Sequence, residues 1–246
     1  KQKTAYEICV CDWSSDVCSS DLNELVAVIK GLIAGDQDIG SIIENLDTEQ
    51  LVALITAIIG DNETLKPILD KLDINQLVAV IKALIAGDVD ISSIIANLEP
   101  YQILKVIAGL FGSELDVTGP DNVTVTETED AVFKVKVNLS LLDQLAGKTY
   151  KYMWLEPDDL TNLNDINFEN IDIISLIARI AGKSLGNGDT FTVQNTTMRD
   201  DGRKFVCVIY NLSDKVFYVT DEVTLTVTPF SDCSHNTLRS VRGLEP

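Results

Sequence analysis

The sequence predicts a multidomain α+β protein in which α-helical hairpin repeats precede a β-rich domain. The first observation is a gapless 26-residue repeat whose apolar residues follow the spacing of a helix. The second is a change to alternating apolar residues after the turn-forming sequence Gly119-Pro120-Asp121. We therefore expect a helical repeat domain over residues 23–116, a β domain over residues 117–229 and a polar tail over residues 230–246.

The first 22 residues resemble a translated sequencing adapter rather than part of a natural protein. Residues 1–8, KQKTAYEI, match one end of a common short-read adapter, and residues 12–22, DWSSDVCSSDL, match the other end in one reading frame. We expect residues 1–22 to be disordered or irregular and exclude them from the fold. The resemblance implies that the native N-terminus and any signal peptide are missing and that the chain is a fragment of a larger protein. It also removes from consideration a zinc or disulfide site built on Cys9, Cys11 and Cys18.

Three copies of the repeat cover residues 25–50, 51–76 and 77–102, and a fourth copy begins at Ile103. Each copy is typical of two short helices joined as a hairpin. The first helices of the later copies are expected to start with capping boxes, in which an acidic residue stands three positions before a glutamine. The two boxes are Asp47-x-x-Gln50 and Asp73-x-x-Gln76. In the fourth copy, Pro100 fits the first helical position.

The two helices of each copy differ in their apolar surface. The second helix is expected to start after an N-cap residue, which is Asp38, Thr64 or Asp90, and it carries apolar residues on one face. The first helix, about residues 24–34 in the first copy, is apolar nearly all round and leaves mainly Lys30 for water. A short helix of this kind must be covered on several sides. Stacked hairpins of an α-solenoid and a compact helical bundle both meet this requirement.

Composition and charge exclude several partners. The 38 acidic side chains outnumber the 19 basic ones, and a net charge of −19 argues against nucleic acid. The longest uncharged run of the repeats, residues 51–60, is far shorter than the ~20 residues that span a bilayer, so no transmembrane segment is expected. The pairs Asp36-x-Asp38 and Asp88-x-Asp90 suggest calcium, but they lack the further oxygen ligands of a calcium loop and are interpreted as helix caps.

Alternating apolar residues predict the strands of the β domain. The expected strands are 122–127, 131–137, 150–154, 190–193, 204–210 and 216–228. A helical insert of about residues 166–185 interrupts them, because Ile171, Ile174 and Ile177 have helical spacing. We expect this insert to pack on the β domain or on the last repeat hairpin through Ile174 and Ile177.

The β domain resembles an immunoglobulin-like sandwich of the kind common in microbial surface proteins. Trp154 stands where that family has its core tryptophan, and residues 201–207, DGRKFVC, resemble the corner before the strand that carries the second cysteine. Phe205 replaces the usual tyrosine, so the hydroxyl hydrogen bond of that corner cannot form. The resemblance implies that Val135 stands at the partner position of Cys207, and we therefore expect no inter-sheet disulfide.

No catalytic, cofactor-binding or metal-binding residue is predicted. Cys233 and His235 lie two residues apart in the tail, whereas a catalytic Cys and His converge from distant positions. Asp158-Asp159 and Asp200-Asp201 are candidate glycosidase carboxylates, but each pair stands in a predicted turn, where aspartate is expected. Cys207 is expected to be a buried small apolar residue.

The resemblance to surface immunoglobulin-like domains implies binding or extension without catalysis, at the cell surface or outside the cell. We therefore expect a non-catalytic adhesin-like or structural module without a cofactor, whose partner is a protein or glycan at the cell surface. An accessory carbohydrate-binding or spacer module of a secreted polysaccharide-active enzyme, and a helical-repeat scaffold that binds a partner helix, remain open as alternatives. N-glycosylation sequons that fit an extracellular glycoprotein open at Asn62, Asn122, Asn138, Asn195 and Asn211.

Overall fold

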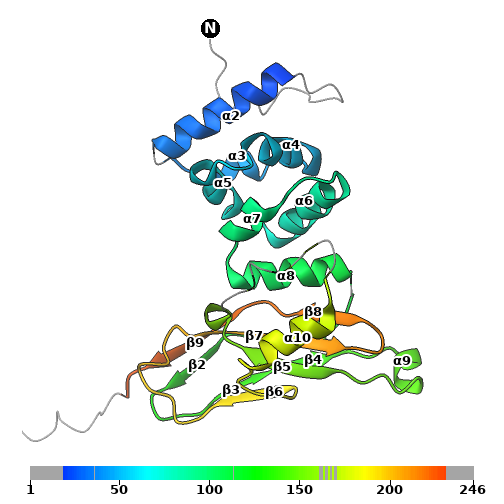
Figure 1. The fold of residues 1–246 in the computed structure, drawn as a ribbon. Coiled ribbons are helices and arrows are strands. Elements are labelled where there is room, and N and C mark those ends of the chain that lie inside the picture. Colours follow the sequence, from blue (N-terminus) through cyan, green and yellow to red (C-terminus); the bar gives the residue numbers. More distant parts are fainter. Residues whose placement is uncertain are drawn as a thin grey trace, which may run out of the picture. The chain divides into compact units, whose positions relative to one another are not determined.

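The computed structural model shows an α+β protein, as the sequence predicts (Figure 1). It describes residues 19–35, 37–112, 114–160, 163, 166, 168 and 171–230. The chain divides into two compact units, a helical one and a β-rich one. The helical unit comprises Lys1–Glu114, Leu160–Ile180 and Leu212–Val219, and the β-rich unit comprises Leu115–Asp159, Ala181–Asn211 and Thr220–Pro246.

Longer and shorter helices alternate along the repeat region of the helical unit (Figure 1). The longer helices are α2 (Ser19–Ala34), α4 (Thr48–Ile58), α6 (Ile74–Ala86) and α8 (Pro100–Phe111). The shorter helices are α3 (Gly40–Ile43), α5 (Asn62–Leu69) and α7 (Ser92–Asn97). The longer helices pack in chain order, α2 on α4, α4 on α6 and α6 on α8, while α5 packs on α7. Each helix thus covers apolar surface that its neighbour presents.

The helix starts with predicted capping boxes are confirmed. The Asp47 carboxylate accepts a hydrogen bond from the Gln50 N–H at 2.8 Å, and the Gln50 side chain accepts one from the Asp47 N–H at 3.0 Å. Asp73 and Gln76 form the same pair at the start of α6, and Pro100 opens α8. Because a box satisfies N–H groups that the first helical turn leaves unpaired, it fixes where each helix begins.

Four helix starts differ from the sequence prediction. Helices α3 and α7 have Ile39 and Ile91 at the N-cap position, without a side-chain hydrogen bond, rather than the predicted Asp38 and Asp90. Helix α2 begins at Ser19 rather than near residue 24, so residues 19–22, which were expected to be irregular, are helical. No glycine or proline stands there to end the helix. Helix α5 begins at Asn62 with Asp61 as its N-cap, and not after Thr64. The reason is that the Asp61 carboxylate accepts hydrogen bonds from both the N–H and the hydroxyl of Thr64.

A small residue permits the close approach of α8 to α6. A Cβ atom added at Gly109 would lie 2.6 Å from Val78 Cγ1, which is closer than any packed Cβ contact. Gly31 occupies the same repeat position in α2, yet nothing lies within 4 Å of a Cβ added there. The same position is therefore crowded in one copy of the repeat and open in another.

The insert forms helix α10 (Ile173–Ala181), within the segment in which a helix was predicted. The contacts of Leu160–Ile180 group this segment with the helical unit, although the sequence placed the insert inside the β domain. Ile177 is 8% exposed, but Ile174 is 65% exposed, so the expectation that Ile174 packs inward is wrong. The buried face is offset by one position and consists of Ile173, Leu176, Ile177 and Ile180.

The β-rich unit contains strands close to the predicted ranges. They are β1 (Val117–Thr118), β2 (Val123–Thr126), β3 (Ala131–Lys134), β4 (Lys136–Val137), β5 (Lys151–Leu155), β6 (Thr190–Val193), β7 (Lys204–Asn211) and β9 (Val223–Thr228). One sheet has the order β2-β9-β7-β5, with β2 parallel to β9 and the other neighbours antiparallel. Strand β3 pairs with β6, and β1 pairs with β4, both antiparallel.

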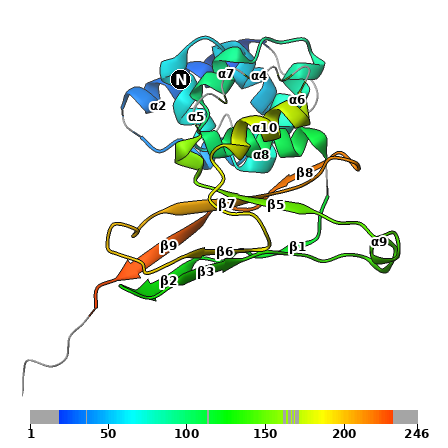
Figure 2. The ribbon, with the colours of Figure 1, turned by 60° about the horizontal axis from the view of Figure 1, so that its bottom comes forward.

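Strands β5 and β7 lie over strands β3 and β6 (Figure 2), and an aromatic cluster joins the two sheets into one core. The Phe133 ring on β3 lies 5.1 Å from the Phe205 ring on β7 and 6.3 Å from the Trp154 ring on β5. Phe191 on β6 stacks on Trp154 at 5.7 Å. Phe133, Trp154 and Phe205 are fully buried, and the Trp154 indole N–H donates to the Gly188 carbonyl at 2.9 Å. The cluster therefore buries large rings without leaving the indole N–H unpaired.

Two features of the β-rich region were not predicted from the sequence. The expected strand over residues 216–228 is broken into β8 (Val216–Val219), in the helical unit, and β9. The break follows from Thr220, which pairs with the backbone of Cys207 through both its N–H and its hydroxyl oxygen. A short helix, α9 (Leu141–Leu145), lies in the loop between β4 and β5.

Gly109→Ala should destabilise the protein, whereas Gly31→Ala should stabilise it. Both changes raise helix propensity by about 1 kcal/mol, but the new methyl group at position 109 collides with Val78. Overpacking of this kind costs about 1–3 kcal/mol. Urea denaturation of the two variants measures the difference directly. Equal stabilisation by both substitutions would show that α6 and α8 do not approach closely at Gly109.

Ile177→Asp should lower the free energy of unfolding by at least about 2 kcal/mol, because it places a carboxylate on the buried face of α10. Ile174→Asp is the matched control, since Ile174 is mostly exposed, and its effect should stay within about 0.5 kcal/mol. Thermal melts and urea titrations report both changes. A larger effect at position 174 than at position 177 would contradict the orientation of α10.

Candidate functional site

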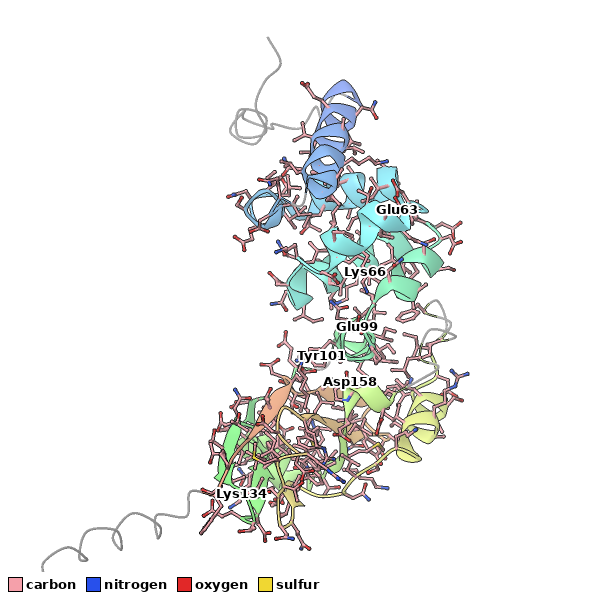
Figure 3. All side chains as sticks on the ribbon, turned by 90° about the vertical axis from the view of Figure 1, so that its left-hand side faces the viewer. Glu63, Lys66, Glu99, Tyr101, Lys134 and Asp158 are labelled. Carbon is pink, nitrogen blue, oxygen red and sulfur yellow. The ribbon has the colours of Figure 1, made fainter. Side chains whose placement is uncertain are left out.

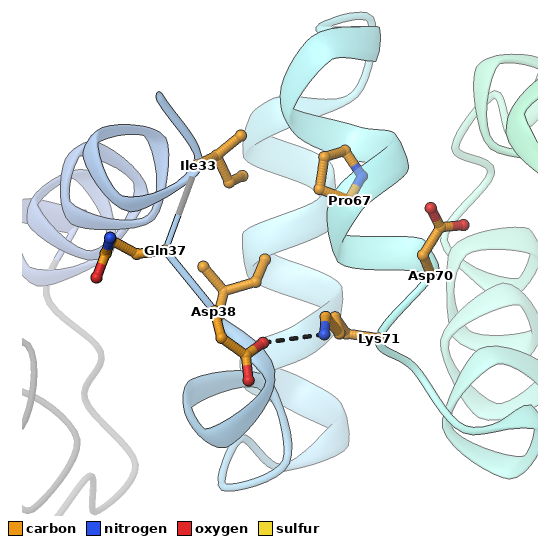
Figure 4. Close-up of a pocket in the computed structure, with 7 residues that line it drawn as sticks. Ile33, Gln37, Asp38, Pro67, Asp70 and Lys71 are labelled. Carbon is orange, nitrogen blue, oxygen red and sulfur yellow. Dashed lines mark ion pairs between the residues drawn. The ribbon is translucent and has the colours of Figure 1, made fainter. Parts of the chain in front are cut away.

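A depression of the helical unit lies between the end of α2 and α5 (Figure 4). It has a volume of about 450 Å³ and is open to solvent. The segment after α2 forms one side, and the last turn of α5 with its following residues forms the other. The lining residues are Ile33, Gln37, Asp38, Ile39, Pro67, Asp70 and Lys71.

An ion pair between two repeats closes one side of this pocket. The Asp38 Oδ1 atom lies 2.9 Å from Lys71 Nζ and also accepts the Gly40 N–H at 3.0 Å. The Gly40 N–H and the Lys71 ammonium lower the pKa of Asp38, and Asp38 in turn raises the pKa of Lys71. Both side chains are largely exposed, at 73% and 45%, so solvent screens the pair and its contribution to stability is small.

The lining residues of the pocket suit binding better than chemistry. Ile33, Ile39 and Pro67 offer apolar contact, and the charged groups stand at the edge. A general base needs a pKa near the working pH, whereas the pKa of Asp38 is shifted downward. The lining residues include no serine, cysteine or histidine that would act as a nucleophile. The pocket therefore combines three apolar lining residues with four polar or charged ones.

Further ion pairs link successive repeats. Lys30 Nζ lies 2.7 Å from Asp61 Oδ2, and Lys66 Nζ lies 3.5 Å from Glu99 Oε1, as Figure 3 illustrates for the second pair. These pairs connect residues about one repeat apart in sequence, so they fix the register of neighbouring hairpins. We do not interpret them as parts of a binding site.

The aspartate pairs considered as calcium ligands are used locally where they are described. The Asp90 carboxylate accepts hydrogen bonds from the N–H and the hydroxyl of Ser92, at 2.9 and 2.6 Å. The Asp38 carboxylate accepts one from the Gly40 N–H at 3.0 Å. Asp36 lies outside the described residues. Within the described part of the chain, no group of three or more His, Cys, Asp or Glu side chains is arranged to hold a metal ion.

The carboxylates considered as a glycosidase pair take part in the turns of the β-rich unit. Asp200 accepts the Thr197 N–H at 2.9 Å and pairs with Arg203, which also contacts Glu156 Oε1 at 2.6 Å. The Thr197 N–H is the main cause of the lowered pKa of Asp200, with Arg203 adding to it. Asp201 accepts the Val227 N–H at 2.8 Å, which ties the turn to β9.

Asp158 and Asp159, the other candidate pair, lie in the single-turn helix η1 (Pro157–Asp159) directly after β5. Both side chains are exposed, as Figure 3 shows for Asp158 in its surface position. Glu156, the residue before this turn, holds the Arg203 guanidinium, which also lies over the Phe205 ring at 5.2 Å. The acidic residues around Arg203 thus hold two turns of the β-rich unit together.

Cys207 is a free, buried cysteine on β7. Burial raises the pKa of its thiol to about 12. Val135, which was expected to stand at the partner position of Cys207, is buried in the same unit. Cys233 and His235, like Cys9, Cys11 and Cys18, lie outside the described residues. A thiol that stays protonated is a poor nucleophile, so Cys207 acts as a packing residue.

Several sequon asparagines serve as hydrogen-bonding groups. Asn122 Oδ1 accepts the Thr224 N–H, Asn62 accepts from Asn97, and Asn138 donates to Asp116 and Thr118. Asn211 donates to the Thr149 carbonyl. Asn195 is exposed in a left-handed conformation, with φ of +50°. Of the five sequons, the one at Asn195 therefore has the geometry of an accessible loop site.

Sequence reasoning missed the loop that carries α9. The signal was present: Ser140 and Asp143 have the spacing of a helix N-terminus, and three leucines stand between two strand patterns. The Asp143 N–H donates to Ser140 Oγ at 3.1 Å, and the leucines of α9 are exposed. This loop is the main apolar surface of the described β-rich unit.

Comparison with protein-family models and with curated protein sequences finds no match to the chain. The described helices include none that is long and apolar enough to cross a membrane.

Cys207 should resist alkylation in the folded protein. At a pH of about 8.5 an ordinary thiol is half ionised, whereas the pKa of Cys207 lies well above that pH. We expect iodoacetamide to leave Cys207 unmodified in native protein and to modify it in urea, as measured by peptide mass spectrometry. The same protein unfolded in urea provides the control. Native labelling at the rate of an unfolded thiol would contradict the burial of β7.

Proposed function

We propose that this chain is a non-catalytic, adhesin-like or structural module of a secreted or cell-surface protein, of which it forms a fragment. In this proposal a stack of helical hairpins carries an immunoglobulin-like sandwich. Its partner is a protein or glycan outside the cell, and no cofactor takes part.

The strand arrangement of the β-rich unit supports the immunoglobulin-like interpretation. Sandwiches of this kind pack two mainly antiparallel sheets on one core, and here β9, β7 and β5 belong to one sheet while β3 and β6 belong to another. Trp154 on β5 is fully buried against rings from β3 and β6, which matches the role of a core tryptophan. This arrangement around Trp154 is the observation that carries the proposal.

The roles of the candidate chemical groups support a non-catalytic module. Asp200 and Asp201 bond the backbone of their own unit, Asp38 and Asp90 bond helix starts, and Cys207 is buried. Catalytic acids and bases need pKa values close to neutrality, but the pKa of Asp38, Asp90 and Asp200 is lowered. The aspartates whose pKa values are lowered thus stabilise turns and helix starts.

The packing of the repeats favours a stack of hairpins over a scaffold with an open groove. Each longer helix contacts the next one along the chain, which is the nearest-neighbour pattern of an α-solenoid. Among the described residues of the repeats, no large apolar side chain is exposed. A groove that holds a partner helix needs an exposed apolar stripe, so the scaffold alternative is disfavoured.

Adhesion of the full chain to defined ligands tests the proposal. Beads coated with the protein should bind a subset of glycans or extracellular proteins on an array, and incubation with soluble polysaccharides should release no reducing ends. Capture only by insoluble polysaccharides would favour the accessory module of a polysaccharide-active enzyme. Turnover of any polysaccharide by the purified chain would overturn the non-catalytic assignment.

A further inference from the structure

Three leucines stand exposed on one short helix of the β-rich unit. Helix α9 lies at the tip of the loop that joins β4 to β5 (Figure 2). Leu141, Leu142 and Leu145 are 71%, 77% and 78% exposed, which makes them the most exposed of the large apolar side chains described. Single exposed leucines are common on protein surfaces, whereas a cluster of three marks a contact surface.

The fold of the loop does not depend on burying these leucines. Ser140 Oγ accepts the Asp143 N–H at 3.1 Å and donates to Asp143 Oδ2 at 2.6 Å. The Gln144 side chain donates to the Leu139 carbonyl at 2.9 Å, and Lys148 Nζ lies 2.7 Å from Asp143 Oδ1. Polar contacts on one side therefore hold the helical turn, and the leucines project as a preformed apolar tip.

The chain segment that contains the loop has more basic than acidic residues, although the whole chain is acidic. Residues 134–151 carry Lys134, Lys136, Lys148 and Lys151 against the single acid Asp143, in a chain whose net charge is −19. Lys134, Lys136 and Lys151 are exposed residues of the strands that lead into and out of the loop. A convex apolar tip with lysines behind it matches a surface that is apolar inside and negatively charged at its face.

We propose that the α9 loop is a membrane-contact element that inserts Leu141, Leu142 and Leu145 into the interface of a bilayer rich in anionic lipids. The leucines enter the boundary between headgroups and acyl chains, and the flanking lysines attract the headgroups. The inference does not depend on the adhesin-like role, since it rests only on this loop. A peripheral contact of this kind needs no membrane-spanning helix.

The negative charge of the whole chain does not prevent this contact at physiological salt. The Debye length is about 8 Å at 0.15 M ionic strength, so only charges close to the lipid surface interact with it strongly. The loop residues nearest the surface carry only the Asp143–Lys148 ion pair, and the exposed Lys136 and Lys151 lie on the strands next to the loop. At about 0.01 M the Debye length grows to ~30 Å, and more distant acidic residues then repel the surface. Binding should therefore be weaker at very low ionic strength than at 0.15 M, which is unusual for electrostatic binding.

Vesicle flotation of the full chain tests the proposal. We expect binding to vesicles of phosphatidylcholine with about one third phosphatidylserine, and much weaker binding to pure phosphatidylcholine. The triple variant Leu141→Ser, Leu142→Ser, Leu145→Ser should reduce partitioning by at least about tenfold. Lys136→Gln with Lys151→Gln should reduce it by about fivefold for each lysine. Ile174→Ser, at an exposed apolar residue outside the loop, is the matched control and should bind as the parent does.

Circular dichroism and thermal melts separate loss of binding from loss of fold, because every substituted side chain is exposed. The proposal is overturned if the parent chain does not float with the anionic vesicles, if it binds neutral vesicles equally well, or if the triple variant binds undiminished. Sedimentation velocity tests the alternative that the leucines contact a second copy of the chain. If the chain self-associates, does not bind vesicles, and loses self-association in the triple variant, the leucines belong to that contact.

Discussion

The helical unit depends on one constraint: its helices are too short and too apolar to be stable alone. A helix of about a dozen residues is marginal in water even with favourable residues, and most of its stability comes from packing. Helices α4, α6 and α8 each bury four apolar side chains, and each one contacts its neighbours in chain order. The contacts between neighbouring helices therefore stabilise the helical unit more than helix propensity does.

The β-rich unit solves the same problem with a few large side chains. Four rings, those of Phe133, Trp154, Phe191 and Phe205, meet between strands of two sheets. Aromatic side chains bury large areas with few rotatable bonds, so they hold short strands together at a modest entropic cost. The Arg203 pairs with Glu156 and Asp200 then fix the turns around this core. No disulfide is formed by Cys207, and the buried rings carry the contact between the sheets.

The charged residues have two distinct roles. In the described repeats, aspartates cap helices, and Lys30, Lys66 and Lys71 pair with acids of neighbouring copies. These pairs are exposed and contribute specificity of register more than stability. Lys136 and Lys151 instead lie on the strands before and after the loop of α9, whose leucines are exposed. The contrast separates residues that build the protein from residues that present a surface to something else.

The sequence determined the α+β class, the capping boxes at Asp47 and Asp73 and most strand positions, because these depend on local hydrogen bonding and on the period of apolar residues. It also placed Asp200 and Asp201 in turns rather than in a reactive site, since aspartate favours turns for local reasons. Only the tertiary structure decided which face of α10 is buried, at Ile177 and not at Ile174, and that Gly109 but not Gly31 is crowded. The exposure of the leucines of α9 was likewise beyond the sequence. Whether an apolar side chain is covered depends on which distant segments reach it, and a local pattern of residues does not contain that information.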